Sequence, residues 1–390
     1  MPERRTFDAI VVGGGSVGVP AAWNLALRGL RVLVLERRPA VGQGDNKAAI
    51  GGIRATHSDP AKIVLSSRSL SQMSAWKETH GADVGWKPGG YAFPVYDEAL
   101  ERTLTGLFPI QRRFDLEIDW IDAKAMAGLV PGINPVGLRG GTYSPNDGQL
   151  SPLKVPVAFQ RAAEGLGAKF AFNEKVVGYT IEGGRIRGVS TEKASYEAPI
   201  VVLATGAEAA RDGELLGLDI KVTPDSHEAG ITAPVAPFLK PLVVDMRPGP
   251  EGKTVNFYFG QNDEGQIIFC YTPKELFVGD VRESLSEFLP ILAARMISLL
   301  PRMRHALVRR VWRGCYPMTP DGVPIVDNVP EVGGLTLAVG MCGQGFMLGP
   351  GVGQEVAALA VDGRSSLPDE AHGKIRWSRN FRAAGTEALK

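Results

Sequence analysis

Three glycines near the N-terminus have the spacing that binds the phosphates of a dinucleotide. Gly13, Gly15 and Gly18 form the pattern G-x-G-x-x-G directly after the apolar residues 10–12. The first glycine permits a tight turn, the second lets a pyrophosphate approach the backbone, and the third lets a helix pack closely on the strand. The N-terminus of that helix offers unpaired N–H groups and a partial positive charge to the phosphates. The spacing therefore predicts a dinucleotide site.

An acidic residue completes this pattern. A helix-compatible stretch follows Gly18, and a second apolar strand, residues 32–35, ends in Glu36. A carboxylate in that place accepts hydrogen bonds from ribose hydroxyls and repels a 2′-phosphate. Because a strand, a helix, a second strand and an acid are all present, we interpret the glycine pattern as a complete βαβ unit.

Composition limits the classes of protein to consider. The 390 residues suggest two or three domains, and a net charge of +1 without a basic block gives no reason to expect nucleic-acid binding. The three cysteines, Cys270, Cys315 and Cys342, are scattered along the chain. They form neither a disulfide framework nor a metal-ligand pattern, so we expect no metal site and a reducing compartment.

The N-terminus could be mistaken for an export signal. Arg4 and Arg5 precede an apolar stretch, as in twin-arginine signals, but Asp8 and the glycine pattern occupy the place of the signal core. No apolar run reaches the roughly 18 to 20 residues of a membrane span. We therefore expect a cytoplasmic protein without a transmembrane segment.

The remaining elements must bring distant segments to this site. A helix is predicted over 59–80 because Asp59 and Pro60 open it as N-cap and first-turn residues. Residues 98–130 read as helical and mixed. Later, the apolar strand 198–203 runs into Ala-Thr-Gly-Ala, and a strand over 335–339 leads through glycines to a helix over 352–361.

The order of these segments resembles a known superfamily. The βαβ unit, the strand ending in Ala204-Thr205-Gly206, and Thr319-Pro320-Asp321-Gly322 followed by a glycine-rich helix start are all present. Together they are similar to the D-amino-acid oxidase and sarcosine oxidase superfamily of FAD enzymes. Within it, the chain resembles the β subunits of heteromeric sarcosine oxidases and dye-linked L-proline dehydrogenases. The similarity covers about residues 6–368.

The resemblance implies an α/β fold with two domains. A Rossmann-like FAD-binding domain would be discontinuous, comprising residues 1–84, 146–225 and 314–390. A mostly antiparallel α+β substrate domain would comprise residues 85–145 and 226–313. The active site would then lie between them.

The resemblance also implies FAD as the cofactor, bound without a covalent link. The glycine-rich segment before the last helix would line the isoalloxazine, and its helix dipole would stabilise negative charge on the reduced ring. A thioether to Cys315 is the alternative, since monomeric relatives attach FAD close to this position. The predicted cofactor residues are Gly13, Gly15, Ser16, Val17, Gly18, Glu36, Arg37, Gly44, Asp45, Asn46, Lys47, Val176, Ala204, Thr205, Gly206, Gly314, Gly343, Gln344, Gly345, Phe346 and Met347.

Family chemistry removes a hydride from the carbon beside an amine nitrogen and gives an imine that hydrolyses. Arg54 is the first candidate residue, because its guanidinium could hold a substrate carboxylate in bidentate fashion. His57 could contact substrate or flavin, although a packing role is the alternative. Tyr258 and Tyr316 correspond to pocket walls in relatives, with core packing as the alternative for each. Met347 would lie beside the flavin.

Three departures from relatives bear on the reaction. Met347 stands where monomeric sarcosine oxidases have a carboxylate-binding lysine. No lysine occurs between Lys253 and Lys274, whereas oxidases of this group use a lysine in that sheet to react with oxygen. Ser151 stands in the region where heteromeric sarcosine oxidases carry a histidine linked to FMN. A dehydrogenase with another electron acceptor or a second subunit is therefore favoured.

We accordingly expect an FAD-dependent enzyme that oxidises the C–N bond of a secondary or D-amino acid. The substrate would be sarcosine-, proline- or glycine-like. A 2-hydroxy-acid or glycerophosphate-type dehydrogenase remains an alternative on the same fold, as does a non-catalytic flavoprotein subunit.

Overall fold

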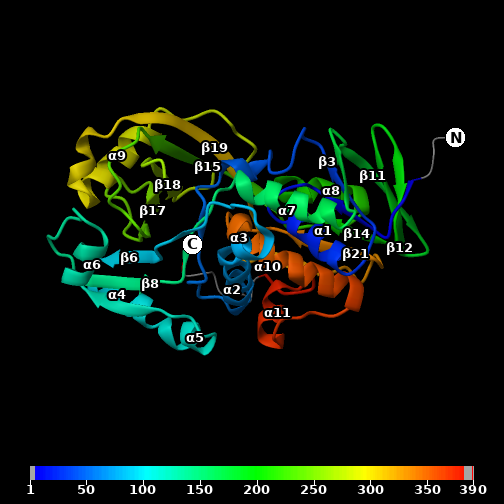
Figure 1. The fold of residues 1–390 in the computed structure, drawn as a ribbon, viewed down its shortest axis with the longest axis horizontal. Coiled ribbons are helices and arrows are strands. Elements are labelled where there is room, and N and C mark those ends of the chain that lie inside the picture. The colour runs from blue at the N-terminus through cyan, green and yellow to red at the C-terminus, as the bar shows by residue number, and fades with distance from the viewer. Residues whose placement is uncertain (1–4, 382–388, 390) are drawn as a thin grey trace.

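A computed structural model describes residues 5–381 and residue 389 of the chain. The molecule has two halves that lie side by side, one built on a six-stranded sheet and the other on an eight-stranded sheet (Figure 1). No helix in the described part of the chain is long and apolar enough to cross a membrane.

The six-stranded sheet contains the predicted βαβ unit. Its neighbouring strands are parallel except for the last pair, which is antiparallel. Helix α1 (Gly18–Leu27) connects two adjacent strands of this sheet. In spatial order the strands are β10 (Lys169–Phe172), β3 (Val32–Glu36), β2 (Ala9–Val12), β14 (Ile200–Leu203), β21 (Leu335–Val339) and β20 (Ile325–Asn328).

Successive residues of the central strands enter two different cores, as the pleat of a sheet requires. In β2, Ala9 and Val11 face one core, whereas Ile10 and Val12 face the other. One face is covered by α1, α2 (Pro60–Ser74), α3 (Trp76–His80), α7 (Lys154–Gly165), α10 (Gly345–Ala357) and α11 (Asp369–Ile375). The other face is covered by α8 (Ala209–Leu216) and by a small sheet of β1 (Arg5–Thr6), β13 (Ser195–Glu197), β12 (Arg185–Thr191) and β11 (Val176–Glu182).

The eight-stranded sheet forms the other half and is antiparallel apart from one pair, β16 with β6. Its strands in spatial order are β19 (Val308–Met318), β15 (Thr223–Thr232), β18 (Ile267–Pro273), β17 (Thr254–Gln261), β16 (Leu242–Asp245), β6 (Tyr91–Val95), β8 (Gly140–Ser144) and β7 (Asp119–Asp122). Helices α6 (Ala123–Leu129) and α9 (Phe288–Leu299) pack on one face. Near the opposite face lie α4 (Glu98–Thr105) and α5 (Phe108–Arg113).

This arrangement confirms the predicted fold class. A small three-stranded sheet of β4 (Gly52–Ile53), β9 (Gly148–Gln149) and β5 (Lys87–Pro88) lies at the junction of the halves. Strands β15 and β19 run across the boundaries expected at 225/226 and 313/314. The division of the chain into domains therefore stays a prediction.

Several predicted elements have different bounds. Residues 98–130, predicted to be helical and mixed, contain the helices α4, α5 and α6 and also the strand β7, which pairs with β8. That strand is set by a partner distant in sequence, which local periodicity does not reveal. The helix over 59–80 is two helices, α2 and α3, although Asp59 caps α2 as expected by accepting the backbone N–H of Ala61. Helix α10 begins at Gly345, seven residues before the predicted start.

Two helices from opposite ends of the sequence, α1 and α10, pack at very short distance. A β-carbon added to Gly349 would lie 2.0 Å from the backbone oxygen of Ser16, and one added to Gly353 would lie 2.7 Å from the backbone of Pro20. Only glycine permits such an approach. This contact places the start of α10 beside the glycine turn of the βαβ unit.

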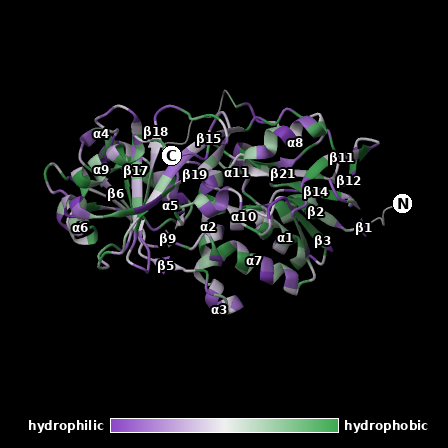
Figure 2. Ribbon diagram, turned by 90° about the horizontal axis from the view of Figure 1, so that it is seen from above, coloured by the Kyte–Doolittle hydropathy of each residue, from purple (hydrophilic) through white to green (hydrophobic). Residues whose placement is uncertain are grey.

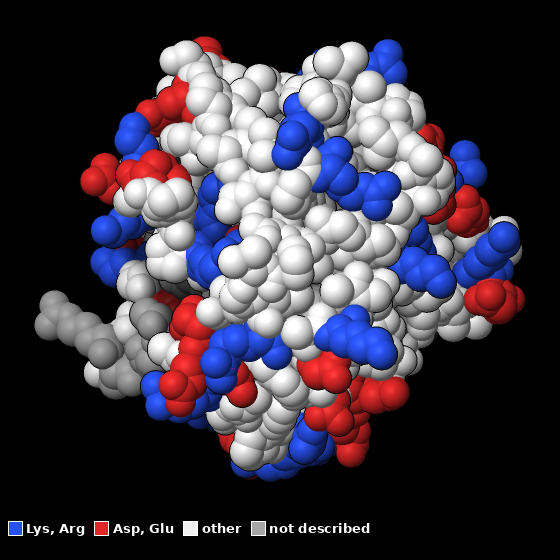
Figure 3. Space-filling model, turned by 90° about the vertical axis from the view of Figure 1, so that its left-hand side faces the viewer, with Lys and Arg blue, Asp and Glu red and all other residues white. Residues whose placement is uncertain are grey.

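The surface and interior show ordinary polarity. Hydrophobic residues concentrate in the interior of both halves (Figure 2). On the side of the molecule shown in Figure 3, lysine and arginine side chains alternate with acidic ones around broad uncharged areas.

The close packing of α10 predicts a steep cost for an added methyl group. Gly349→Ala should lower the free energy of unfolding by about 1–3 kcal/mol or more, the usual penalty for overpacking a core. The control is Gly373→Ala in α11, where an added β-carbon meets nothing within 4 Å. Since alanine favours helices, this control should be neutral or stabilising by up to about 1 kcal/mol. Urea unfolding of both variants measures the difference, and equal stabilities would contradict the packing argument.

Candidate active site

A cleft of about 480 Å³ runs between the two large sheets and is lined by segments from the whole length of the chain. Most residues predicted to contact the cofactor or substrate lie on its walls. Three do not: Gly18, Lys47 and His57. The predicted residues on the walls are Gly13, Gly15, Ser16, Val17, Glu36, Arg37, Gly44, Asp45, Asn46, Arg54, Val176, Ala204, Thr205, Gly206, Tyr258, Gly314, Tyr316, Gly343, Gln344, Gly345, Phe346 and Met347.

One end of the cleft suits a dinucleotide. A β-carbon on Gly15 would meet no atom within 4 Å, so this glycine leaves open space in the cleft where a pyrophosphate must approach. No side chain caps the N-terminus of α1 at Val17. The Glu36 carboxylate accepts hydrogen bonds from the backbone N–H groups of Gly14 and Arg38, both at 2.7 Å, and still borders the cleft.

The two predicted cofactor residues outside the cleft have simple explanations. A β-carbon on Gly18 would lie 1.9 Å from the oxygen of Gly13, so this glycine serves the packing of helix on strand. Lys47 is exposed on the short helix η1 (Asp45–Ala48) and points away from the walls.

The other end of the cleft is formed by the start of α10. Gln344 is buried, and its side-chain oxygen has no hydrogen-bond partner among the described residues. No side chain caps the N-terminus of α10, so the first backbone N–H groups of this helix have no capping acceptor beside the cleft. The unpaired oxygen of Gln344 can accept a hydrogen bond from a ring N–H of a flavin. The helix N-terminus beside it fits the electron-rich oxygens of the flavin's pyrimidine edge.

Two neutral tyrosines stand together on the wall made by the eight-stranded sheet. The hydroxyl groups of Tyr258 and Tyr316 are 2.7 Å apart. Burial raises the pKa of both well above its ordinary value, so each acts as a neutral hydroxyl. The Tyr316 ring lies against Gly343, where a β-carbon would come within 2.4 Å of it.

A histidine that the sequence analysis missed supports this wall. His227 stacks on the Tyr316 ring with centroids 3.8 Å apart, and its Nε2 lies 2.8 Å from an oxygen of Asp225. Both residues line the cleft from alternate positions of β15. A histidine in a long strand carries no sequence signal that distinguishes a wall residue from a core residue.

Arg54 is the buried cation of the cleft. Of the lysines and arginines on its described walls, it alone is buried, with 6% of its surface exposed. Its guanidinium donates to the backbone oxygens of Thr56 and Leu389, the latter at 2.6 Å. His57 is fully buried behind it, with Nδ1 3.4 Å from an Arg54 nitrogen.

A second missed residue, Asp147, organises the segment that carries Arg54. One carboxylate oxygen accepts the backbone N–H of Ala55 at 2.8 Å, and the other accepts the Thr56 hydroxyl at 2.6 Å. Burial raises the pKa of Asp147 to about 6 in spite of these hydrogen bonds. In the sequence it resembles an ordinary turn residue between proline and glycine.

Cys315 does not have the character of an attachment site. Its sulfur is 3.2 Å from Asp280 Oδ1 and 3.5 Å from Ser226 Oγ. Burial raises the pKa of the thiol to about 12, which keeps it protonated and weakly nucleophilic. The environment is consistent with non-covalent binding of a cofactor.

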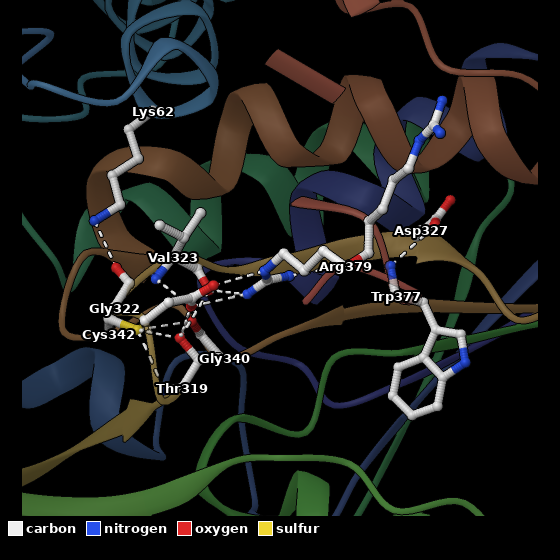
Figure 4. A network of polar contacts seen from close by, with 11 residues as sticks. Lys62, Thr319, Gly322, Val323, Asp327, Gly340, Cys342, Trp377 and Arg379 are labelled. Carbon is white, nitrogen blue, oxygen red and sulfur yellow. Dashed lines mark hydrogen bonds and ion pairs between the residues drawn. The ribbon is translucent and has the colours of Figure 1, made fainter. Parts of the chain in front are cut away.

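The segment after Leu367 binds the loop that contains Thr319 and Asp321 (Figure 4). Arg379 donates two hydrogen bonds to the buried Asp321 carboxylate, at 2.8 and 3.0 Å. Although burial alone would raise it, the pairing with Arg379 keeps the pKa of Asp321 below its usual value. Asp321 in turn accepts the Thr319 hydroxyl, which lies 3.3 Å from the sulfur of Cys342. The C-terminal segment thus fixes the loop beside the start of α10.

Comparison with known proteins identifies the family. Residues 8–359 match the family of FAD dependent oxidoreductases, and the chain belongs to it. Glycine oxidase from Geobacillus kaustophilus is 28% identical over 90% of this chain and 92% of its own. Sarcosine oxidase subunit beta from Rhodobacter capsulatus is 23% identical over 95% of this chain and 88% of its own. Mitochondrial sarcosine dehydrogenase from Mus musculus is 24% identical over 93% of this chain, which spans 40% of that longer protein.

A solved structure agrees with both the fold and the family. L-proline dehydrogenase from P. horikoshii superimposes with a TM-score of 0.88 and is 30% identical, covering 95% of this chain and 97% of its own. These findings confirm the predicted superfamily and establish an FAD-dependent oxidoreductase with the amino-acid-oxidising enzymes as its relatives. The open glycine turn and the unpaired Gln344 amide show that the residues present fit FAD.

The buried Asp147 predicts a pH dependence of stability. The folded protein holds this proton up to a pKa of about 6, whereas an unfolded aspartate releases it near 3.8. The native state therefore binds more protons between these values, and its stability falls as pH rises through this window, by on the order of 3 kcal/mol. Asp147→Asn should remove this part of the pH dependence. Its amide oxygen can still accept the backbone N–H of Ala55, whereas its NH2 group would have to donate to the Thr56 hydroxyl oxygen. Urea unfolding of both proteins from pH 4 to 7 tests it, and a pH-independent difference between them would contradict it.

Proposed function

We propose that the protein oxidises the C–N bond of a small secondary or D-amino acid to an imine and passes the electrons to an acceptor other than oxygen. The observation that carries this proposal is the guanidinium of Arg54, which is the one buried among the described walls of a cleft that also fits FAD. FAD, when bound, supplies the two-electron acceptor for the hydrogen on the substrate α-carbon. The protein supplies binding, orientation and exclusion of water.

Arg54 is suited to hold the substrate carboxylate. A guanidinium presents paired donors that match a carboxylate in bidentate geometry. The apolar side chains of Leu242 and Val244 line the cleft on the sheet side and exclude water from this end. Met347 also lines the cleft but offers no charge, so it cannot replace the lysine of monomeric sarcosine oxidases.

The tyrosine pair is suited to hold the amine end. The hydroxyl groups of Tyr258 and Tyr316 are neutral and can accept or donate a hydrogen bond. A neutral wall favours an amine that binds without its extra proton, because an ammonium would be desolvated without a counter-charge. Only the neutral amine carries the lone pair that stabilises the developing imine.

Two features support a dehydrogenase over an oxidase. The lysine-free stretch between Lys253 and Lys274 covers all of β17 and β18, and Lys274 itself is exposed at the rim of the cleft. The likeness to L-proline dehydrogenase from P. horikoshii, which is 30% identical, is the second feature. The name of the Rhodobacter relative, sarcosine oxidase subunit beta, supports a second subunit as the partner but does not itself favour a dehydrogenase. The three cysteines are free and buried, which supports a reducing, cytoplasmic location.

Anaerobic titration of the FAD-loaded protein tests the reaction. We expect sarcosine, a proline enantiomer, glycine or D-alanine to bleach the flavin absorbance, with slow recolouring in air because oxygen is not the acceptor. Bleaching by lactate or glycerol 3-phosphate instead would replace the amine proposal with a hydroxy-acid or glycerophosphate dehydrogenase. Bleaching by dithionite alone would point to a non-catalytic subunit.

Replacement of Arg54 tests the carboxylate site. Arg54→Ala should raise the half-saturating concentration of the amino acid by about 10- to 100-fold, since a hydrogen bond to a charged group contributes about 1.5–3 kcal/mol. Arg54→Lys should recover part of this loss, because lysine restores the positive charge but not the paired N–H donors of the guanidinium. Arg309→Ala, an exposed arginine of β19 outside the cleft, is the matched control. Unchanged half-saturation in Arg54→Ala would place the carboxylate elsewhere.

A further inference from the structure

Leu389 lies against the proposed carboxylate site. Its backbone oxygen contacts the guanidinium of Arg54, which lines the cleft between the two halves shown in Figure 1. The Leu389 side chain is 1% exposed and packs in an apolar cluster with Tyr91, Phe93, Leu242 and Val244. Three of these four cluster residues also line the cleft, namely Tyr91, Leu242 and Val244.

Leu389 meets Arg54 directly through its backbone. Arg54 Nη2 donates to the Leu389 oxygen at 2.6 Å, while Nη1 donates to the Thr56 oxygen. The guanidinium carbon lies 5.9 Å from the centre of the Phe93 ring, which belongs to the same cluster as Leu389. Leu389 itself is not on the cleft wall. It therefore holds the guanidinium from behind.

Such an anchor has a physical purpose. A guanidinium binds a carboxylate well only when its plane is fixed, because both N–H groups must point at the ligand together. The carbonyls of Thr56 and Leu389 each fix one terminal nitrogen. The buried leucine side chain also excludes water from the space behind Arg54, which strengthens the charged hydrogen bonds in front of it.

We propose that Leu389 is a positioning residue for Arg54, so that a residue far along the chain from Arg54 completes the carboxylate end of the active site. The inference rests on the proposed role of Arg54 in binding a substrate carboxylate. Since Leu389 acts through Arg54, its loss should weaken ligands that carry a carboxylate and spare amines that lack one. A purely structural role would weaken both classes equally.

The test uses the full FAD-loaded protein and two variants. One ends after Phe381 and so lacks residues 382–390, and the other is Leu389→Ala, which keeps the backbone carbonyl. For each we would measure the dissociation constant of propionate, an unreactive carboxylate, from the change in flavin absorbance. Half-saturation by proline and by pyrrolidine, its counterpart without a carboxylate, would be measured from anaerobic flavin reduction.

We expect the shortened chain to bind propionate and proline about tenfold more weakly, the effect of one lost charged hydrogen bond, with pyrrolidine changed less than twofold. Leu389→Ala should show the same selectivity with a smaller change. Leu367→Ala is the matched control, because it removes another buried leucine, 7% exposed, from a hydrophobic core of the other half. It should lower stability without changing the ratio of the two ligands.

The outcomes separate the two proposals. If Arg54→Ala leaves propionate binding unchanged, the proposed function of Arg54 fails. If Arg54→Ala weakens propionate but neither C-terminal variant does, the inference about Leu389 fails alone. Tighter propionate binding by the shortened chain would also overturn it, because the chain end would then compete with the ligand instead of positioning Arg54.

Discussion

The approach of α10 to α1 sets the geometry on which the cleft depends. These helices come from opposite ends of the sequence, yet Gly349 and Gly353 let their backbones touch. The contact places the start of α10 beside the turn that carries Gly15, so that two uncapped helix N-termini face one cleft. Electron-rich parts of a dinucleotide and of a flavin are stabilised at such termini. A cofactor that spans both can therefore be held largely by backbone groups.

The sequence predicted this arrangement well where local rules decide it. The strand, glycine turn and helix around Gly15 follow from residue spacing, and so does the acidic end at Glu36. The strand β7 and the early start of α10 were not foreseen, because both depend on distant partners. Strand β7 exists through its pairing with β8, and α10 can begin at Gly345 because it packs on α1. Hydrophobic periodicity within a short window of sequence reveals neither the pairing of β7 nor the packing of α10.

The residues of the candidate site also form two groups: those that lie in sequence motifs and those that act through neighbours distant in sequence. Residues in motifs, such as Gly343 and Tyr316, were found by their position relative to glycines and prolines. Asp147, His227 and Leu389 were missed, since each acts through a neighbour that is far away in sequence. Asp147 supports the backbone near Arg54, and His227 supports a tyrosine ring. Spacing rules identify groups that contact a ligand, whereas supporting groups become visible only when the chain is folded.

The supporting residues Asp147, His227 and Leu389 all bear on the charge balance of the cleft. A buried guanidinium is costly unless polar groups surround it, and here neutral carbonyls hold Arg54. Asp225, the buried acid on the tyrosine wall, is engaged by His227 and by the backbone N–H of Phe277. The buried Asp147 carboxylate also interacts electrostatically with Arg54 and offsets part of its charge. An incoming carboxylate would therefore meet a partly compensated guanidinium, and an amine would meet neutral hydroxyls. That pattern favours an amino acid as its anion, with a neutral amine ready to become an imine.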